Sequence, residues 1–273
     1  MTATTPAKRA AFRKLHDAGC FVIPNPWDVG SAIALQSLGF KALASTSAGM
    51  AWSMGRPDNR VERDDVLVHL TLLAGRTDIP VNADFENGFA HDADGVAANV
   101  ALAVATGIAG LSVEDSTGDA AAPLYDFDLA VARIAAARAA IDRNGADVML
   151  TARSEGFIRG RPDIAETLRR LTAYAAAGAD CLFAPGLSDP DQIRSVVQAV
   201  APKPVNLISP GLSVAAVAGL GVRRISVGGS LARVAWAGFL QAARQIADEG
   251  VFDGFAAGTP GAQLNRLFSD APA

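Results

Sequence analysis

The sequence predicts a (β/α)8 barrel, an α/β fold in which eight parallel strands are each followed by a helix. Short apolar runs rich in Val, Ile and Ala alternate with longer helical segments, and this unit recurs eight times. The length of 273 residues and the 50% hydrophobic content suit a single barrel. A doubly wound open sheet is the second choice, because no glycine-rich dinucleotide turn follows the first strand. We expect one domain over residues 1–273, with a helical tail from about residue 250.

Local signals set the limits of each element. The chain enters an amphipathic helix before residue 12, Asp28 or Ser31 caps the next helix, and Gly39 ends it. We expect strands at residues 20–24, 41–45, 79–84, 110–114, 148–152, 181–184, 205–208 and 224–227. We expect later helices at residues 64–76, 92–106, 127–143, 164–177, 190–200, 212–220, 230–249 and 263–268. Residues 45–49 are expected to form a small, polar stretch, and a looser segment is expected to follow it up to residue 58.

Composition excludes several classes of protein. The net charge is −4 with acids and bases interspersed, so no basic tract predicts a nucleic-acid partner. No apolar run reaches about 18 residues, so no membrane span is expected. Cys20 and Cys181 form no disulfide framework and suit a reducing cytoplasm. His16, His69 and His91 are expected on helix surfaces and receive no catalytic role.

Acidic residues close two neighbouring strands. Asp84 ends one apolar run and Glu86 follows it, while Glu114 and Asp115 end the next. A buried unpaired charge is costly, so acids at these places need a partner. Carboxylate oxygens are the ligands that Mg²⁺ selects, with Mn²⁺ as an alternative. The competing interpretation is that these acids only cap helices.

Further polar residues follow other strands. In a (β/α)8 barrel the active site lies at the carboxyl ends of the strands, so these side chains face one mouth. Arg153 can bind a substrate carboxylate through two parallel hydrogen bonds, or it can simply neutralise the acids. Other strand-end residues include Trp27, Asp28, Ser45, Thr46, Ser47, Glu155 and Asn206, and the backbone of the stretch that contains Ala48 can hold a further anion.

The pattern of these residues resembles the isocitrate lyase/phosphoenolpyruvate mutase superfamily over about residues 12–250. Asp84-Phe85-Glu86-Asn87-Gly88-Phe89 is similar to the magnesium motif of that family, and Val113-Glu114-Asp115 to its glutamate-aspartate pair. Other matching segments, in family order, are residues 25–28, 46–49, 55–58 and 152–155.

The resemblance implies a barrel whose last helix is exchanged between the subunits of a dimer or tetramer. It also implies Mg²⁺ bound to a 2-oxo acid or dicarboxylate. Glu86 would then be the direct metal ligand, with Asp84 and Glu114 acting partly through water. Arg153, Asp58 and Glu114 would be the catalytic residues. The substrate would contact Trp27, Thr46, Ser47, Ala48, Arg153 and Asn206.

One segment departs from the family. Residues 116–125 contain no Cys, Lys or His, whereas isocitrate and methylisocitrate lyases carry a lysine-lysine-cysteine-glycine-histidine loop there. Those two activities are therefore not expected. The first hypothesis is a magnesium-dependent lyase-type enzyme acting on an oxaloacetate-like substrate by C–C cleavage, decarboxylation or hydrolysis. The alternatives are a 2-oxo acid binding protein with little turnover, and C–P bond chemistry on phosphonopyruvate.

Overall fold

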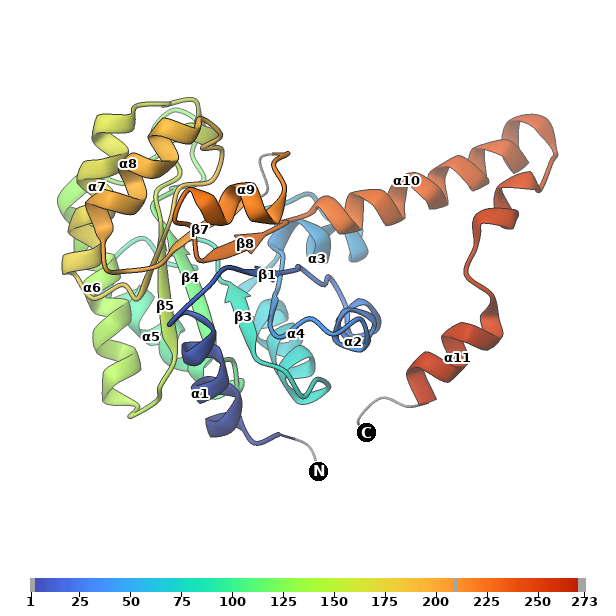
Figure 1. Ribbon diagram of the computed structural model, residues 1–273, viewed down its shortest axis with the longest axis horizontal. Coiled ribbons are helices and arrows are strands. Elements are labelled where there is room, and N and C mark those ends of the chain that lie inside the picture. Colours follow the sequence, from blue (N-terminus) through green and yellow to red (C-terminus); the bar gives the residue numbers. More distant parts are fainter. Residues whose placement is uncertain (1–2, 209–210, 270–273) are drawn as a thin grey trace.

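Every strand of the sheet pairs in parallel with its neighbours, in the order β1-β8-β7-β6-β5-β4-β3-β2. The computed structural model describes residues 3–208 and 211–269. The strands are β1 Phe21–Ile23, β2 Leu43–Ala44, β3 Val81–Asp84, β4 Gly110–Glu114, β5 Met149–Arg153, β6 Cys181–Phe183, β7 Val205–Ile208 and β8 Arg224–Ser226. The amide of Ala44 donates a hydrogen bond to the Pro24 carbonyl (N–O 3.0 Å), which joins the first strand to the second. The predicted (β/α)8 barrel is confirmed (Figure 1).

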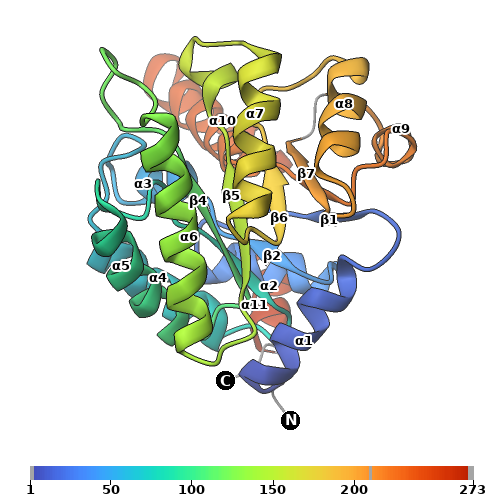
Figure 2. The ribbon, with the colours of Figure 1, turned by 90° about the vertical axis from the view of Figure 1, so that its left-hand side faces the viewer.

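Helices cover the outside of this barrel (Figure 2). They are α1 Thr5–Leu15, α2 Val29–Ser37, α3 Ser47–Ser53, α4 Arg63–Gly75, α5 Ala93–Ala105, α6 Phe127–Arg143, α7 Ile164–Ala176, α8 Pro190–Val200, α9 Val214–Gly219, α10 Ser230–Arg244 and α11 Gly261–Ser269. A π turn, Gln245–Glu249, continues α10 to the predicted end of that helix. Among the residues described, no helix is long and apolar enough to cross a membrane.

Helix α1 closes the amino-terminal end of the barrel. Its Phe12 is fully buried and packs in one cluster with Ala42, Ala109 and Met149. These three residues precede or begin strands, so the Phe12 ring fills the end of the barrel opposite the carboxyl ends. His16, at the end of α1, is buried as well, so the prediction of a surface histidine there was wrong.

Helix α3, Ser47–Ser53, begins in the polar stretch 45–49 and continues into the segment that was expected to be looser. Thr46 is its N-cap and accepts a hydrogen bond from the Gly49 amide (Oγ1–N 3.3 Å). Gly49 has no space for a side chain, because a Cβ there would lie 2.7 Å from Cγ2 of Thr46 and 2.9 Å from Cβ of Trp27. The close approach of these residues holds the start of α3 at the mouth of the barrel.

Helix α10 points away from the barrel (Figure 1). Of its residues, only Ala232 is buried, whereas the side chains of Val234 and Phe239 are 71% and 61% exposed. The chain then turns back, and α11 contacts α2. The eighth helix therefore does not pack its apolar face on the barrel of its own chain.

Candidate active site

Arg153 lies at the centre of a group of carboxylates at the carboxyl ends of β3, β4 and β5. Its Nη1 is 2.7 Å from Oδ1 of Asp84, and its Nη2 is 3.0 Å from Oε2 of Glu114. Glu155 completes the group, with its Oε1 2.9 Å from the same Nη2. Strand pairing produces this arrangement, because Arg153 is the register partner of Glu114. The structure thus brings Asp84, Glu114 and Arg153, which the sequence places at strand ends, together at one mouth.

Burial makes the charge balance of this group unusual. Burial and the neighbouring Glu155 raise the pKa of Glu114 well above its ordinary value, against the opposing effect of Arg153. Burial also raises the pKa of Glu155. Burial by itself would lower the pKa of Arg153, but the three surrounding carboxylates raise it. The guanidinium therefore stays charged, and three acids share it, two of them with Arg159 also nearby.

Glu86 occupies a strained turn immediately after β3. Its φ is +45°, a left-handed conformation that costs a residue with a side chain about 1–3 kcal/mol. Phe89 in the same turn has φ of +53°. Arg133 of α6 holds the turn by donating hydrogen bonds to the carbonyls of Asn87, Ala90 and His91. Strain that the surrounding structure maintains is characteristic of functional sites.

The carboxylate of Glu86 has neither an ion pair nor a hydrogen bond among the described residues, although it is buried. Burial, together with the negative charges of Asp84 and Asp58, raises its pKa to about 8. A divalent cation would relieve this repulsion. The donor set therefore fits Mg²⁺. In the described part of the chain, however, no three acidic, histidine or cysteine side chains lie close enough together to hold an ion, because Arg153 stands between Asp84 and Glu114.

Two cavities at the mouth contain most of the predicted site residues. The first, of about 180 Å³, is lined by Asn206 and by Thr46, Ser47, Ala48, Asp58, Asp84 and Arg153. The second, of about 530 Å³, is lined by Asp58, Glu86 and Glu114. Asp58 belongs to both cavities and Arg153 bonds to acids of both, so the two are neighbouring parts of one site.

Trp27 lies outside both cavities. It lines a separate space with Trp236 and Phe239 of α10, and its Cβ contacts the start of α3. Asp28, the next residue, caps α2 by accepting a hydrogen bond from the Ser31 amide (Oδ1–N 2.6 Å). In this chain, Trp27 thus faces a space that it shares with the eighth helix rather than the group around Arg153.

Asp115 points away from the mouth, although it follows Glu114 directly. Its Oδ2 accepts hydrogen bonds from the Tyr174 hydroxyl at 2.7 Å and from Arg170 at 3.1 Å. Its Oδ1 accepts from the amide of Glu155 at 2.8 Å. Successive residues of a strand face opposite sides, so only one member of the acidic pair can face the interior. Asp115 anchors the strand ends from outside.

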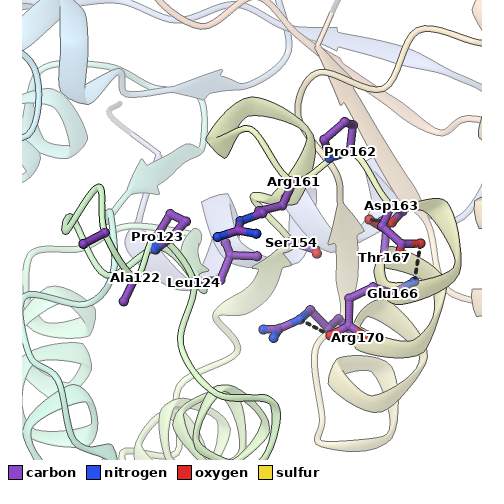
Figure 3. Close-up of a pocket in the computed structure, with 12 residues that line it drawn as sticks. Ala122, Pro123, Leu124, Ser154, Arg161, Pro162, Asp163, Glu166, Thr167 and Arg170 are labelled. Carbon is purple, nitrogen blue, oxygen red and sulfur yellow. Dashed lines mark hydrogen bonds and ion pairs between the residues drawn. The ribbon is translucent and has the colours of Figure 1, made fainter.

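A larger cavity of about 550 Å³ lies beside the mouth, between residues 121–124 and α7 (Figure 3). Its carboxylates already have partners. Asp163 caps α7 by accepting from the amide of Glu166, and Glu166 pairs with Arg170 (Nε–Oε1 2.8 Å). Arg161 extends toward Leu124 across this space. Because its acids are satisfied, this cavity is a weaker candidate for the reacting site than the group around Arg153.

Sequence reasoning missed two side chains at the mouth. Arg159, on the short 3-10 turn Gly156–Arg159, lies 3.4 Å from Glu114 and 3.5 Å from Glu155. His91 lines the second cavity, and its Nδ1 is 2.8 Å from the Tyr125 hydroxyl. The spacing of Glu155 and Arg159, four residues apart, was the only signal for the first. The contact between His91 and Tyr125 joins residues 34 apart and had no local signal.

The segment 116–125 folds into a short hairpin-like loop. Ser116 and Leu124 form an isolated antiparallel bridge, and the Thr117 amide donates to the Pro123 carbonyl at 3.0 Å. Ser116, Thr117 and Gly118 line the second cavity. The loop therefore reaches the mouth, but it brings hydroxyl groups there and no thiol, amine or imidazole.

Comparison with known proteins agrees with this architecture. Residues 12–247 match the family model described as phosphoenolpyruvate phosphomutase. An uncharacterized protein of Mycobacterium tuberculosis is 35% identical over 80% of this chain and 81% of its own length. Oxaloacetate decarboxylase of Paraburkholderia xenovorans is 29% identical over 72% of this chain and 67% of its own.

Solved structures show the same fold. A Burkholderia cenocepacia protein, provisionally assigned as a lyase or mutase, superposes with a TM-score of 0.94 at 46% identity over 97% of both chains. Oxaloacetate acetylhydrolase bound to oxalate superposes with a TM-score of 0.86 at 26% identity, over 97% of this chain and 94% of that one. The match to the family model and the similarity to a decarboxylase confirm the prediction of a lyase-type enzyme. The chain belongs to the isocitrate lyase/phosphoenolpyruvate mutase superfamily.

Proposed function

We propose that the protein is a magnesium-dependent lyase-type enzyme that acts on a small 2-oxo acid or dicarboxylate, preferably an oxaloacetate-like one. The observation that supports this most is the ring of carboxylates closed around Arg153 at the ends of three strands. The named activities of oxaloacetate decarboxylase and oxaloacetate acetylhydrolase, which are similar proteins, favour the same substrate class.

Glu86, Asp84 and Glu114 are the proposed metal-holding residues, for Mg²⁺ or Mn²⁺. Glu86 is the leading candidate for direct ligation, because its buried carboxylate has no other partner among the described residues. When bound, the metal supplies positive charge for the developing enolate oxygen of the substrate. Binding would also require Arg153 to release part of its contact with Asp84 and Glu114, which frees the guanidinium for an incoming carboxylate.

Arg153 would bind the 2-oxo carboxylate through two N–H groups and orient the substrate. Thr46, Ser47 and Ala48 line the same cavity and would add hydrogen bonds from the start of α3. Asp58 lies on the border of the two cavities and would contact the reacting centre. Asn206 would line the pocket directly. Trp27 would shape it indirectly, because it packs against Gly49 near the start of α3.

Decarboxylation of oxaloacetate is the preferred reaction because it needs no protein acid at the outset. The C–C bond to the distal carboxylate breaks, carbon dioxide leaves, and the electron pair passes into the enolate of pyruvate, which takes a proton from water. Ser116 and Thr117 can order that water at the second cavity. The absence of a stronger acid in residues 116–125 also favours the second candidate, a 2-oxo acid binding protein with little turnover.

We also propose that the protein is a homo-oligomer in which α10 packs against a second copy of the chain. The apolar face of α10 is exposed over most of its length, and an exposed apolar surface of this kind is unusual in a monomeric protein. A dimer or tetramer formed by such an exchange would bury Val234 and Phe239. Both cysteines are free, in keeping with the proposed cytoplasmic location.

The experiment that tests the enzyme proposal measures pyruvate release from oxaloacetate with and without Mg²⁺. Wild-type protein should release pyruvate above the metal-catalysed background, and Glu86→Ala should abolish the difference. Asp17→Ala is the matched control, since Asp17 is an exposed acid just after α1, at the opposite end of the barrel from the mouth, and its side chain makes no hydrogen bond or ion pair among the described residues. Oxalate binding without turnover of any 2-oxo acid would support the binding-protein alternative instead.

A further inference from the structure

The interior of this barrel contains a buried arginine without a counter-ion. Arg224 begins β8 and is 3% exposed. Its Nε donates to Oδ1 of Asn206 at 2.8 Å, and its Nη2 donates to Oγ1 of Thr151 at 3.0 Å. Its Nη1 lies 3.5 Å from Nε2 of His16. Within residues 3–208 and 211–269, no carboxylate forms an ion pair with it.

All three of these neighbours are neutral. Nδ1 of His16 donates to the Phe12 carbonyl at 2.8 Å, which leaves Nε2 as an acceptor toward Arg224. Burial and the charge of Arg224 lower the pKa of His16 to about 3, so the imidazole stays uncharged. A guanidinium has five N–H groups, and the three contacts occupy three of them. Two N–H groups and a full positive charge remain without a partner in the described chain.

The surroundings of Arg224 are polar and hollow. The side chains that face the interior beside it include Asn82, Ser112, Thr151, Asn206 and Ser226, all buried. Barrels of this type usually fill this region with large branched apolar residues. Here the 180 Å³ cavity that contains Arg153 also reaches Arg224 and Ser226. A buried cation beside an open polar space is an environment that binds an anion.

The position of Arg224 relative to Arg153 indicates which kind of anion would bind at Arg224. Arg224 bonds to Thr151, which lies two residues before Arg153 on β5 and faces the same side. Two residues along a strand span about 7 Å. Thr151, which holds Arg224, and Arg153 are thus about 7 Å apart along β5, and both arginines line the same cavity, an arrangement suited to the two carboxylates of a short diacid.

We infer that Arg224 is a specificity-determining residue that binds the distal carboxylate of a 2-oxo or 2-hydroxy diacid whose first carboxylate is bound by Arg153. The inference rests on the proposed function and narrows its substrate class to diacids. A structural role alone does not explain Arg224, because an apolar side chain of similar volume would avoid the cost of burying an unpaired charge.

An ion pair between Arg224 and the distal carboxylate should affect KM and kcat differently. In a decarboxylation the distal carboxylate leaves as neutral carbon dioxide, so an ion pair to it is stronger in the bound substrate than in the transition state. Such an interaction lowers KM and does not raise kcat. Loss of the Arg224 charge should therefore raise KM for oxaloacetate at least tenfold while kcat stays the same or rises.

The test compares binding of oxalate, lactate and malate in the presence of Mg²⁺ by calorimetry. Malate carries a distal carboxylate that lactate lacks, so their affinity ratio measures binding of that group. Oxalate is too short to reach Arg224, so its affinity measures only binding at the end of the site near Arg153. Wild-type protein should bind malate at least tenfold more tightly than lactate. Arg224→Gln, which keeps hydrogen-bond donors without the charge, should reduce this ratio below threefold and change oxalate affinity less than twofold.

Arg224→Met and Arg223→Met complete the design. Arg223 is the neighbouring, half-buried arginine and donates only to the Gly19 carbonyl (3.1 Å), so its variant should keep the wild-type ratio. Arg224→Met should melt at the wild-type temperature or above it if the charge serves ligand binding. An unchanged malate-to-lactate ratio in folded Arg224→Gln overturns the inference and leaves the proposed function standing. Failure of wild-type protein to bind oxalate overturns the proposed function itself.

Discussion

Arg153 and Glu114 are register partners on β5 and β4, and their side chains form an ion pair across that pairing (Nη2–Oε2 3.0 Å). The contact is buried, and the same guanidinium also holds Asp84 and Glu155. Arg153 thus pairs with three carboxylates at the ends of three strands, and Arg159 lies near two of them. This makes Arg153 both a stabilising element of the mouth and the group that a substrate carboxylate must share.

Replacing Arg153 by Met should destabilise the metal-free protein. The buried carboxylates would lose their common cation, which costs about 3–5 kcal/mol when one partner of a buried pair is removed. Urea unfolding at pH 8 measures this loss. The loss should be smaller at pH 5 than at pH 8, because burial raises the pKa of both Glu114 and Glu155 and so favours their uncharged forms as the pH falls. Arg169→Met is the control, since Arg169 forms an exposed pair with Glu166 and its removal should cost under about 1 kcal/mol.

Stability of the metal-free protein should fall as pH rises from about 5 to 8. Glu86 has a pKa of about 8 in the folded protein and 4.5 otherwise, so the native state binds the extra proton in this window. The free energy of unfolding then decreases by up to about 1.4 kcal/mol per pH unit from this group alone. Glu86→Gln should be more stable than wild type at pH 8 and should show a shallower slope in urea titrations.

The Glu86→Gln variant also distinguishes proton binding from metal binding at this position. Mg²⁺ competes with the proton at Glu86, so millimolar Mg²⁺ should raise the melting temperature of wild-type protein more at pH 8 than at pH 6. Glu86→Gln should lose this response, whereas Asp17→Asn, at an exposed acid after α1, should keep it. An equal response in all three proteins would contradict metal binding at Glu86.

The fold was predictable because its signal is repeated and local. Eight apolar runs separated by helical segments appear directly in the residue order, and strand positions such as 110–114 match the structure to the residue. The meeting of Asp84, Glu114 and Arg153 was predictable as well, because carboxyl ends of parallel strands share one edge. Strand alternation also implies that Glu114 and Asp115 face opposite sides, so only one of these two acids can reach the mouth.

Contacts made across the chain were not predictable in the same way. Arg159 reaches the mouth because a 3-10 turn follows β5, and no residue pattern distinguishes that turn from a loop. Arg224 looks like one member of an ordinary Arg-Arg pair, and only strand pairing shows that it faces inward while Arg223 does not. Trp27 can approach the start of α3 closely because residue 49 is a glycine. Ala232 of α10, which is distant in sequence, packs against the same glycine.

Tyr174→Phe should weaken the anchor of β4 without altering the ligand site directly. The variant removes a 2.7 Å hydrogen bond to the buried carboxylate of Asp115, a charged acceptor whose loss costs about 1.5–3 kcal/mol. Asp115→Asn should cost more, because Arg170 would then lose its buried counter-charge. Guanidinium unfolding gives both values. A metal affinity that drops tenfold in Tyr174→Phe would show instead that this network positions Glu114.

The exposed apolar face of α10 predicts an assembly that a single charge can disrupt. Phe239 is 61% exposed and packs edge-on against Trp236, with ring centroids 5.6 Å apart. If a second copy covers this face, Phe239→Glu places an unpaired charge in an apolar interface and should shift the protein from dimer or tetramer to a smaller species. Light scattering after gel filtration measures the mass directly. Arg244→Glu, a charge change at the exposed end of the same helix, should leave the mass unchanged. A wild-type monomer at micromolar concentration would contradict the exchange, because 15 residues of α10 would then keep their apolar face in water.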